Sequence, residues 1–190
     1  MNRAVVLDVP QAWVEARRVA GADRWDELWN GELHMVPAPA SAHQALNGRL
    51  YRILAPLAEA QGLVAFFETG LYRPGADNDY RVPDQTYARP EFVSQRGIEG
   101  VAELVVEILS PGDESRAKLD WYAAVGVVEV LLVDPTSRGA ELFATSGPTS
   151  SPATMEPISA PLFVASVQAT LATEPGPLLR VDWSDGSVHI

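Results

Sequence analysis

Two short apolar runs constrain the fold of this chain more than any other feature of its sequence. Residues 103–109 are almost continuously apolar, and residues 127–133 follow the same pattern. Short runs rich in branched residues are strands rather than helices, and near-continuous apolar strands occur where a sheet is covered on both faces. The sequence therefore predicts a buried sheet with helices packed on it.

The remaining hydrophobic pattern supplies those helices and further strands. Leu46, Leu50 and Leu54 recur at helical spacing after Ser41, the expected N-cap. In chain order the predicted core elements are a helix at 41–61, strands at 63–72, 79–88 and 103–109, a helix from 111–113 to 126, and a strand at 127–133 with a hairpin partner at 140–144. This order of helix, three strands, helix and strand predicts an α/β fold with a mixed sheet.

Shorter elements precede this core. Residues 8–29 are predicted to be helical at both ends, with a break near Gly21. Asn30-Gly31 then forms a tight turn into a short strand at 32–36, where polar and apolar residues alternate. The core is therefore expected to carry an N-terminal helical and strand extension.

The C-terminal third predicts no second core. Residues 145–161 are rich in Ser, Thr and Pro, which predicts an irregular loop rather than a packed element. The tail from Leu162 is expected to pack back on the core and to end in a hairpin around 184–186. We therefore expect one domain over residues 1–190, with a core at about 25–145.

Composition excludes several kinds of chemistry and argues against a membrane or secreted location. The chain has no cysteine, so disulfides, thiolate catalysis and cysteine-bound metals are excluded. The formal net charge of −11 does not suit a protein that holds nucleic acid by bulk electrostatics. No stretch approaches the roughly 20 apolar residues of a membrane helix, and no signal-peptide core precedes the first charges. These features predict a cytoplasmic protein without a membrane segment.

Two carboxylates occupy energetically unfavourable positions in or beside the predicted strands. Glu107 lies within the apolar run 103–109, and Asp84 follows Pro83 one strand earlier. A buried charge is costly unless it is neutralised, paired or open to a cleft. Two carboxylates on adjacent strands repel each other, and a magnesium ion with oxygen ligands is a common solution. An equal alternative is that each carboxylate pairs with an arginine, or that Asp84 is an exposed loop residue.

Lys118 is the only lysine among 14 basic residues. Its compact ammonium differs from the planar guanidinium of arginine, so a single retained lysine indicates a position where shape or deprotonation matters. The alternative is a surface pair with Glu114, one helical turn earlier, in a chain biased toward arginine.

The motifs around these residues also follow a specific order. It consists of Gly31-Glu32-Leu33, Pro37-Ala38-Pro39, His43-Gln44, Pro83-Asp84, Val106-Glu107-Ile108-Leu109-Ser110-Pro111, and Lys118 with Tyr122 and Gly126-Val127. With these motifs the chain resembles the Uma family of restriction-endonuclease-like proteins, in the PD-(D/E)XK nuclease superfamily. The superfamily core is helix, three strands, helix and strand, which is the order predicted above.

The resemblance implies roles for three residues. Asp84 and Glu107 would ligate a divalent metal, Mg²⁺ or Mn²⁺, while a lysine would orient or help activate the attacking water. The superfamily places that lysine two residues after the glutamate, where this chain has Leu109. In the Uma family the lysine has moved to the next helix, which makes Lys118 the substitute.

The resemblance also implies accessory residues. Glu32 and His43 match family positions and would border the site as a further ligand or a proton carrier, and Tyr122 is a third accessory candidate. The alternative for His43 is a hydrogen-bonded structural residue near a helix start. Spacings typical of zincins, serine hydrolases and phosphate-binding glycine loops are absent from the sequence.

Together these features predict a metal-dependent endonuclease that hydrolyses phosphodiester bonds in nucleic acid, with DNA as the substrate class that the resemblance implies. The net negative charge would require a local basic track, for which the candidates are Arg49, Arg52, Arg73 and Arg81. Many relatives that cut duplexes act as dimers to reach both strands, so the resemblance implies a homodimer as one arrangement, although the sequence itself does not give the oligomeric state. Two alternatives stay open: a non-catalytic binding or regulatory module with a nuclease fold, and a structural role in which arginines satisfy Asp84 and Glu107.

Overall fold

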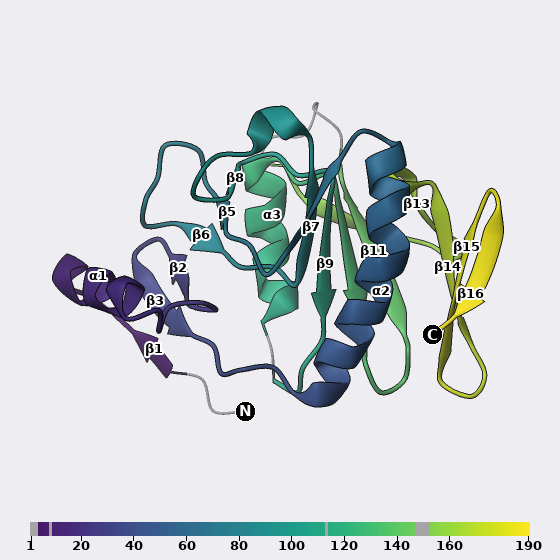
Figure 1. Ribbon diagram of the computed structural model, residues 1–190, viewed down its shortest axis with the longest axis horizontal. Helices are drawn as coiled ribbons and strands as arrows, with labels where there is room; N and C mark the ends of the chain where they lie inside the picture. Colours follow the sequence, from purple (N-terminus) through teal and green to yellow (C-terminus); the bar gives the residue numbers. More distant parts are fainter. Residues whose placement is uncertain (1–3, 8, 113, 147–152) are drawn as a thin grey trace.

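A six-stranded sheet, here called the central sheet, lies in the middle of the computed structural model, which describes residues 4–7, 9–112, 114–146 and 153–190 (Figure 1). Its strands in spatial order are β12 (Met155–Ile158), β11 (Ala140–Thr145), β10 (Glu129–Val133), β9 (Leu104–Ile108), β7 (Gln85–Ala88) and β4 (Val64–Phe67). Strands β9 and β10 are parallel, and the other neighbours are antiparallel. The predicted α/β fold class with a mixed sheet is confirmed.

One helix packs on each face of the central sheet. Helix α2 (Ser41–Ala60) shares a buried cluster with Val106 of β9, whereas α3 (Leu119–Val125) shares another with the preceding residue, Val105. Successive side chains of a strand point to opposite faces, so these two clusters lie on the two sides of the sheet. This arrangement explains why the run in β9 is apolar at almost every position.

The C-terminal segment forms a second, antiparallel sheet, the C-terminal sheet. It consists of β13 (Leu162–Val164), β14 (Ala169–Glu174), β15 (Leu178–Trp183) and β16 (Gly186–His189), with a 3₁₀ turn, η3 (Ala165–Val167), after β13. Leu171 and Val181 join the buried cluster of α2, so the tail packs back on the core as predicted. Trp183 pairs with Gly186, which confirms the predicted terminal hairpin.

The third sheet, the N-terminal sheet, combines the first strands of the chain with short strands from residues 71–99. Its strands in spatial order are β1 (Ala4–Val6), β3 (Glu32–Met35), β2 (Glu27–Trp29), β6 (Tyr80–Arg81), β5 (Leu71–Tyr72) and β8 (Ile98–Glu99), and helix α1 (Gln11–Val19) connects β1 to β2. The turn at Asn30-Gly31 is confirmed, with positive φ angles of 50° and 91°. The predicted helical segment at 25–29 is wrong: Leu28 pairs with Leu33 across this turn, so hairpin pairing determines the local structure.

Two predicted strands are divided between the central and N-terminal sheets. Residues 63–72 form β4 and then β5, and residues 79–88 form β6 and then β7. The first break is at Glu68, whose φ of 47° is a left-handed conformation that non-glycine residues rarely adopt. The second includes Pro83, which has no N–H to donate. The Glu68 N–H donates to the Asp84 carbonyl at 3.1 Å, so the two breaks lie side by side.

The predicted loop at 145–161 contains a strand, so that prediction is wrong for part of the segment. Residues 155–158 form β12 and pair with β11 at the edge of the central sheet, where a proline such as Pro157 is tolerated. Residues 147–152 lie outside the described residues.

The second core helix begins later than predicted. A 3₁₀ helix, η2 (Ser115–Lys118), leads into α3, and the predicted end at Gly126 is confirmed by its left-handed φ of 100°. Asp113, in the predicted helix start, lies outside the described residues. No helix in the described ranges has the length and apolar character needed to cross a bilayer.

The packing of α2 predicts a large effect of one leucine. Leu54 is fully buried between the helix and the sheets, so Leu54→Ala should lower the free energy of unfolding by about 2–5 kcal/mol through lost burial and cavity formation. Arg52→Ala, at an exposed position of the same helix, should change it by less than about 0.5 kcal/mol. Urea denaturation measures both, and equal losses would show that α2 does not pack as described.

Candidate active site

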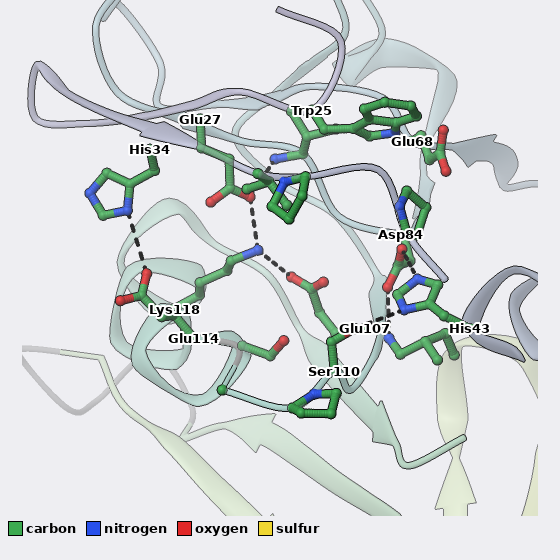
Figure 2. A pocket seen from close by; sticks show the side chains of 18 residues that line it. Trp25, Glu27, His34, His43, Glu68, Asp84, Glu107, Ser110, Glu114 and Lys118 are labelled. Carbon is green, nitrogen blue, oxygen red and sulfur yellow. Dashed lines mark hydrogen bonds and ion pairs between the residues drawn. The ribbon is translucent and has the colours of Figure 1, made fainter. Parts of the chain in front are cut away.

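A cleft of about 140 Å³ opens between the N-terminal sheet and one end of the central sheet (Figure 2). Its polar lining residues are Glu27, His34, His43, Glu68, Asp84, Glu107, Ser110, Glu114, Ser115 and Lys118. Trp25, Val36, Pro37, Pro39 and Val82 are among the residues of its apolar wall. The structure therefore brings together four of the residues predicted from sequence: His43, Asp84, Glu107 and Lys118.

Asp84 and Glu107 reach the cleft from neighbouring strands. Gln85 pairs with Val106 in the antiparallel register of β7 and β9, and Asp84 directly precedes Gln85, so continuing this register by one position would place it opposite Glu107. The Ile108 N–H donates to Asp84 Oδ2 at 2.7 Å, which fixes the carboxylate at this end of the sheet. Side chains at opposite positions of neighbouring strands point to the same face, so both carboxylates reach the cleft.

The Lys118 side chain points into the cleft and contacts two buried carboxylates, those of Glu27 and Glu107. Its Nζ lies 2.8 Å from Glu27 Oε1 and 3.0 Å from Glu107 Oε1. The expected alternative, a surface pair with Glu114, is wrong, because Glu114 Oε2 instead lies 3.4 Å from His34 Nδ1. The 3₁₀ helix η2 therefore delivers the only lysine into the cleft.

Tyr122 and His43 complete the contacts of the two central carboxylates. The Tyr122 hydroxyl donates to Glu107 Oε1 at 2.5 Å. His43 Nε2 lies 2.8 Å from Asp84 Oδ1, and its Nδ1 lies 3.3 Å from Ser110 Oγ. Within the described residues no arginine contacts Asp84 or Glu107, so the arginine-pairing alternative is wrong.

Glu27 and Glu68 are cleft residues that the sequence did not reveal. Glu68 accepts hydrogen bonds from Gln44 Nε2 at 2.5 Å and from Arg24 Nη2 at 3.2 Å. Glu27 is held by Lys118, 91 positions away in the chain, so no local spacing indicates it. The turn sequence Asn30-Gly31 is the local signal that bears on Glu27, because a hairpin at this turn makes residues 27–29 a strand paired with β3.

Other predicted residues lie away from these contacts. Glu32 is exposed on β3 and is not among the residues that line the cleft. Arg73 and Arg81 both bind Asp79, and Arg81 is buried, so neither adds to an exposed basic track. Of the four predicted arginines, Arg49 and Arg52 are exposed, both on α2.

The buried charges of the cleft shift one another's ionisation. Burial, together with the charges of Asp84 and Glu27, raises the pKa of Glu107 to about 7, against the lowering effect of the Lys118 ammonium. Burial would raise the pKa of Glu27. The charge and hydrogen bond of Lys118, together with the hydrogen bonds from Val82 and Trp29, outweigh burial and lower that pKa. Burial would lower the pKa of Lys118, yet the two carboxylates raise it, so the ammonium stays charged.

The same charges also shift the pKa values of Tyr122 and His43. Burial and the charge of Glu107 raise the pKa of Tyr122 well above its usual value, so its hydroxyl remains a donor. Burial lowers the pKa of His43, but the hydrogen bond to Asp84 and the charges of Asp84, Glu107 and Glu68 outweigh it and raise that pKa.

The donor set fits a hard divalent cation. Mg²⁺ is usually bound by one or two carboxylates together with waters and substrate phosphates. Asp84 and Glu107 supply two carboxylates in one cleft, and burial and the charge of Asp84 both raise the pKa of Glu107, so a nearby cation would favour its ionised form. In the part of the chain that the structure describes, no group of three or more His, Asp or Glu side chains could hold a metal ion. The remaining ligands would therefore come from solvent and substrate.

Comparison with known proteins defines first a class of fold and then a family. The chain is similar in fold to a crystal structure from Anabaena variabilis described as "a putative nuclease belonging to DUF820", with a TM-score of 0.55, 17% identity, and coverage of 72% of this chain and 77% of that one. The family model Uma2, described as "Putative restriction endonuclease", matches residues 14–172. The chain belongs to this family, which confirms the resemblance predicted from its motifs. A search of curated proteins found no match.

The two contacts of Lys118 predict a large loss of stability when its charge is removed. Lys118→Met leaves Glu27 and Glu107 buried without their cation, which should lower the free energy of unfolding by about 3–5 kcal/mol. Arg116 lies on the same 3₁₀ helix as Lys118 and forms an exposed ion pair with Glu141. Arg116→Met removes this cation and should lower the free energy of unfolding by less than about 1 kcal/mol. Chemical denaturation at neutral pH compares the two, and equal costs would contradict the buried position of Lys118.

Proposed function

We propose that the protein is a metal-dependent endonuclease that hydrolyses phosphodiester bonds in DNA. The observation that carries this proposal is that Asp84 and Glu107 line the same cleft, with the Lys118 ammonium 3.0 Å from Glu107. Membership of the Uma2 family supports a nuclease function. A cleft with an excess of carboxylates suits a cation, which in turn attracts a phosphate group.

Asp84 and Glu107 are the residues that would hold Mg²⁺ or Mn²⁺. When bound, such an ion polarises a phosphoryl oxygen and lowers the pKa of a coordinated water. Asp84 is preorganised for this role because the Ile108 N–H and His43 Nε2 fix its two oxygens. A metal ligand whose orientation is set by hydrogen bonds of this kind loses less conformational freedom on binding.

Lys118 would stabilise the negative charge that develops on the phosphoryl oxygens. Its ammonium is largely buried, charged and held before substrate arrives, and preorganised charges of this type contribute most in a site that excludes water. Tyr122 supports it indirectly, since its hydroxyl fixes Glu107 Oε1 beside the ammonium. His43, between Asp84 and Ser110, is positioned to carry a proton at the edge of the cleft.

DNA contact would rely on the cation and on few arginines. The protein carries a net charge of −11, and two of the four arginines considered for a basic track are bound to Asp79. Arg49 and Arg52, exposed on the helix that also carries His43, remain as candidates for phosphate contacts. With so few contacts, binding should depend on the divalent ion as much as on the protein surface.

Metal binding is the first test of this proposal. Titration calorimetry with Mn²⁺ should give a saturable heat for the wild type, because a cation relieves the repulsion between Asp84 and Glu107. The double variant Asp84→Asn with Glu107→Gln should give none, whereas Asp120→Asn, at an exposed position of α3, should bind as the wild type does. Unchanged heat in the double variant would place the cation elsewhere.

Cleavage by Lys118→Arg is the second test. Arginine keeps the charge, but its planar guanidinium cannot occupy the place of an ammonium enclosed by two carboxylates. We expect Lys118→Arg to bind Mn²⁺ and to cleave plasmid DNA about 10²-fold or more slowly, as loss of one preorganised charge typically does. Arg116→Lys is the matched control and should cleave at the wild-type rate. Activity of the wild type in EDTA would contradict the metal dependence, and no cleavage of any substrate would favour the non-catalytic binding module.

A further inference from the structure

The two carboxylates that contact Lys118 differ in how firmly they are held. Glu27 uses both oxygens: Oε1 also accepts the Val82 N–H at 3.0 Å, and Oε2 accepts the Trp29 indole N–H at 2.8 Å. Glu107 shares Oε1 between Lys118 and Tyr122, and its Oε2 accepts no hydrogen bond from the described residues. Rotation of Glu27 would therefore break more contacts than rotation of Glu107.

The donors to Glu27 are themselves immobilised by packing. The Trp29 ring stacks on His34 with centroids 4.1 Å apart, and the Arg81 guanidinium lies 4.3 Å from the Trp29 ring. Arg81 in turn donates to the Leu28 carbonyl and to Asp79. Glu27 thus belongs to a buried framework within the N-terminal sheet, and its carboxylate is a fixed point on the wall of the cleft.

We propose that Glu27 is the positioning residue that holds the Lys118 ammonium in the cleft beside Glu107. This inference rests on the proposed function for its consequence in cleavage, but the geometry it describes can be tested without activity. A lysine on a helix reaches the cleft through a flexible side chain of four methylene groups, and an ordered partner limits the positions of its charge. Glu27, at 2.8 Å, is that partner, whereas Glu107 remains available to the cation.

The only lysine of the chain gives a direct measurement of this arrangement. Labelling with ¹⁵N-lysine yields one side-chain ammonium signal, and its protons are observable only when hydrogen bonding and burial slow their exchange with water. We expect the signal in the wild type and in Glu107→Gln, and its loss in Glu27→Gln. Loss in Glu107→Gln, or persistence in Glu27→Gln, would overturn the proposal. If Glu27→Gln does not fold, the Glu107→Gln spectrum still decides between the two carboxylates.

Cleavage kinetics provide the functional arm. Glu27→Gln should lower kcat by about 10- to 100-fold, the usual cost of losing a supporting contact behind a catalytic group. KM should change by less than about twofold, because Glu27 acts through Lys118 and not on substrate binding. Glu27→Asp keeps the negative charge, although its side chain is shorter by one methylene group. Its kcat should lie between those of Glu27→Gln and the wild type.

Glu15→Gln is the control for the change of charge. Glu15 is exposed on α1, and this variant should cleave as the wild type does. Wild-type kcat in Glu27→Gln would overturn the proposal. Absence of cleavage by the wild-type protein would instead contradict the proposed function, and the ammonium signal would then decide the positioning role by itself.

Discussion

The Lys118 ammonium connects the two sheets that form the cleft. Glu27 comes from β2 of the N-terminal sheet and Glu107 from β9 of the central sheet, and one cation lies between them. Removing charged groups from water costs several kcal/mol for each ion unless the partners are close and well hydrogen-bonded. Lys118 therefore offsets the cost of placing Glu27 and Glu107 close together, while Leu71 of the N-terminal sheet joins the buried apolar cluster on the α3 side. The charge distribution of the cleft depends on this contact.

The fold could be predicted where local pattern and tertiary environment agree. The apolar run in β9 and the leucine spacing in α2 identify a strand covered on both faces and the helix that covers it. Prediction failed where pairing determined structure: β2 forms through its hairpin partner, and β12 is a largely exposed edge strand next to β11. It also failed at Glu68, where a left-handed residue divides one apparent strand between two sheets.

The same distinction applies to the site. Asp84, Glu107 and Lys118 could be predicted because their motifs have a specific order along the chain, and the structure places all three in one cleft. Glu27 could not be predicted, since nothing in its local sequence distinguishes its carboxylate and its partner Lys118 lies 91 residues away. Long-range ion pairs leave no periodic signal, so only the three-dimensional arrangement reveals them.

The location of the lysine explains why a second carboxylate is needed. A lysine two residues after Glu107 would share its strand and its face of the sheet, so the strand itself would direct the ammonium toward the cleft. In this chain that position is Leu109, which packs in the cluster on the α3 side, and the ammonium arrives from η2 instead. The direction of a side chain from a separate element is not set by the strand of Glu107, so another contact has to fix the position of its charge. Glu27 on β2 supplies that contact. A lysine that enters the cleft from η2 instead of from β9 therefore requires a buried carboxylate on β2 to fix its ammonium.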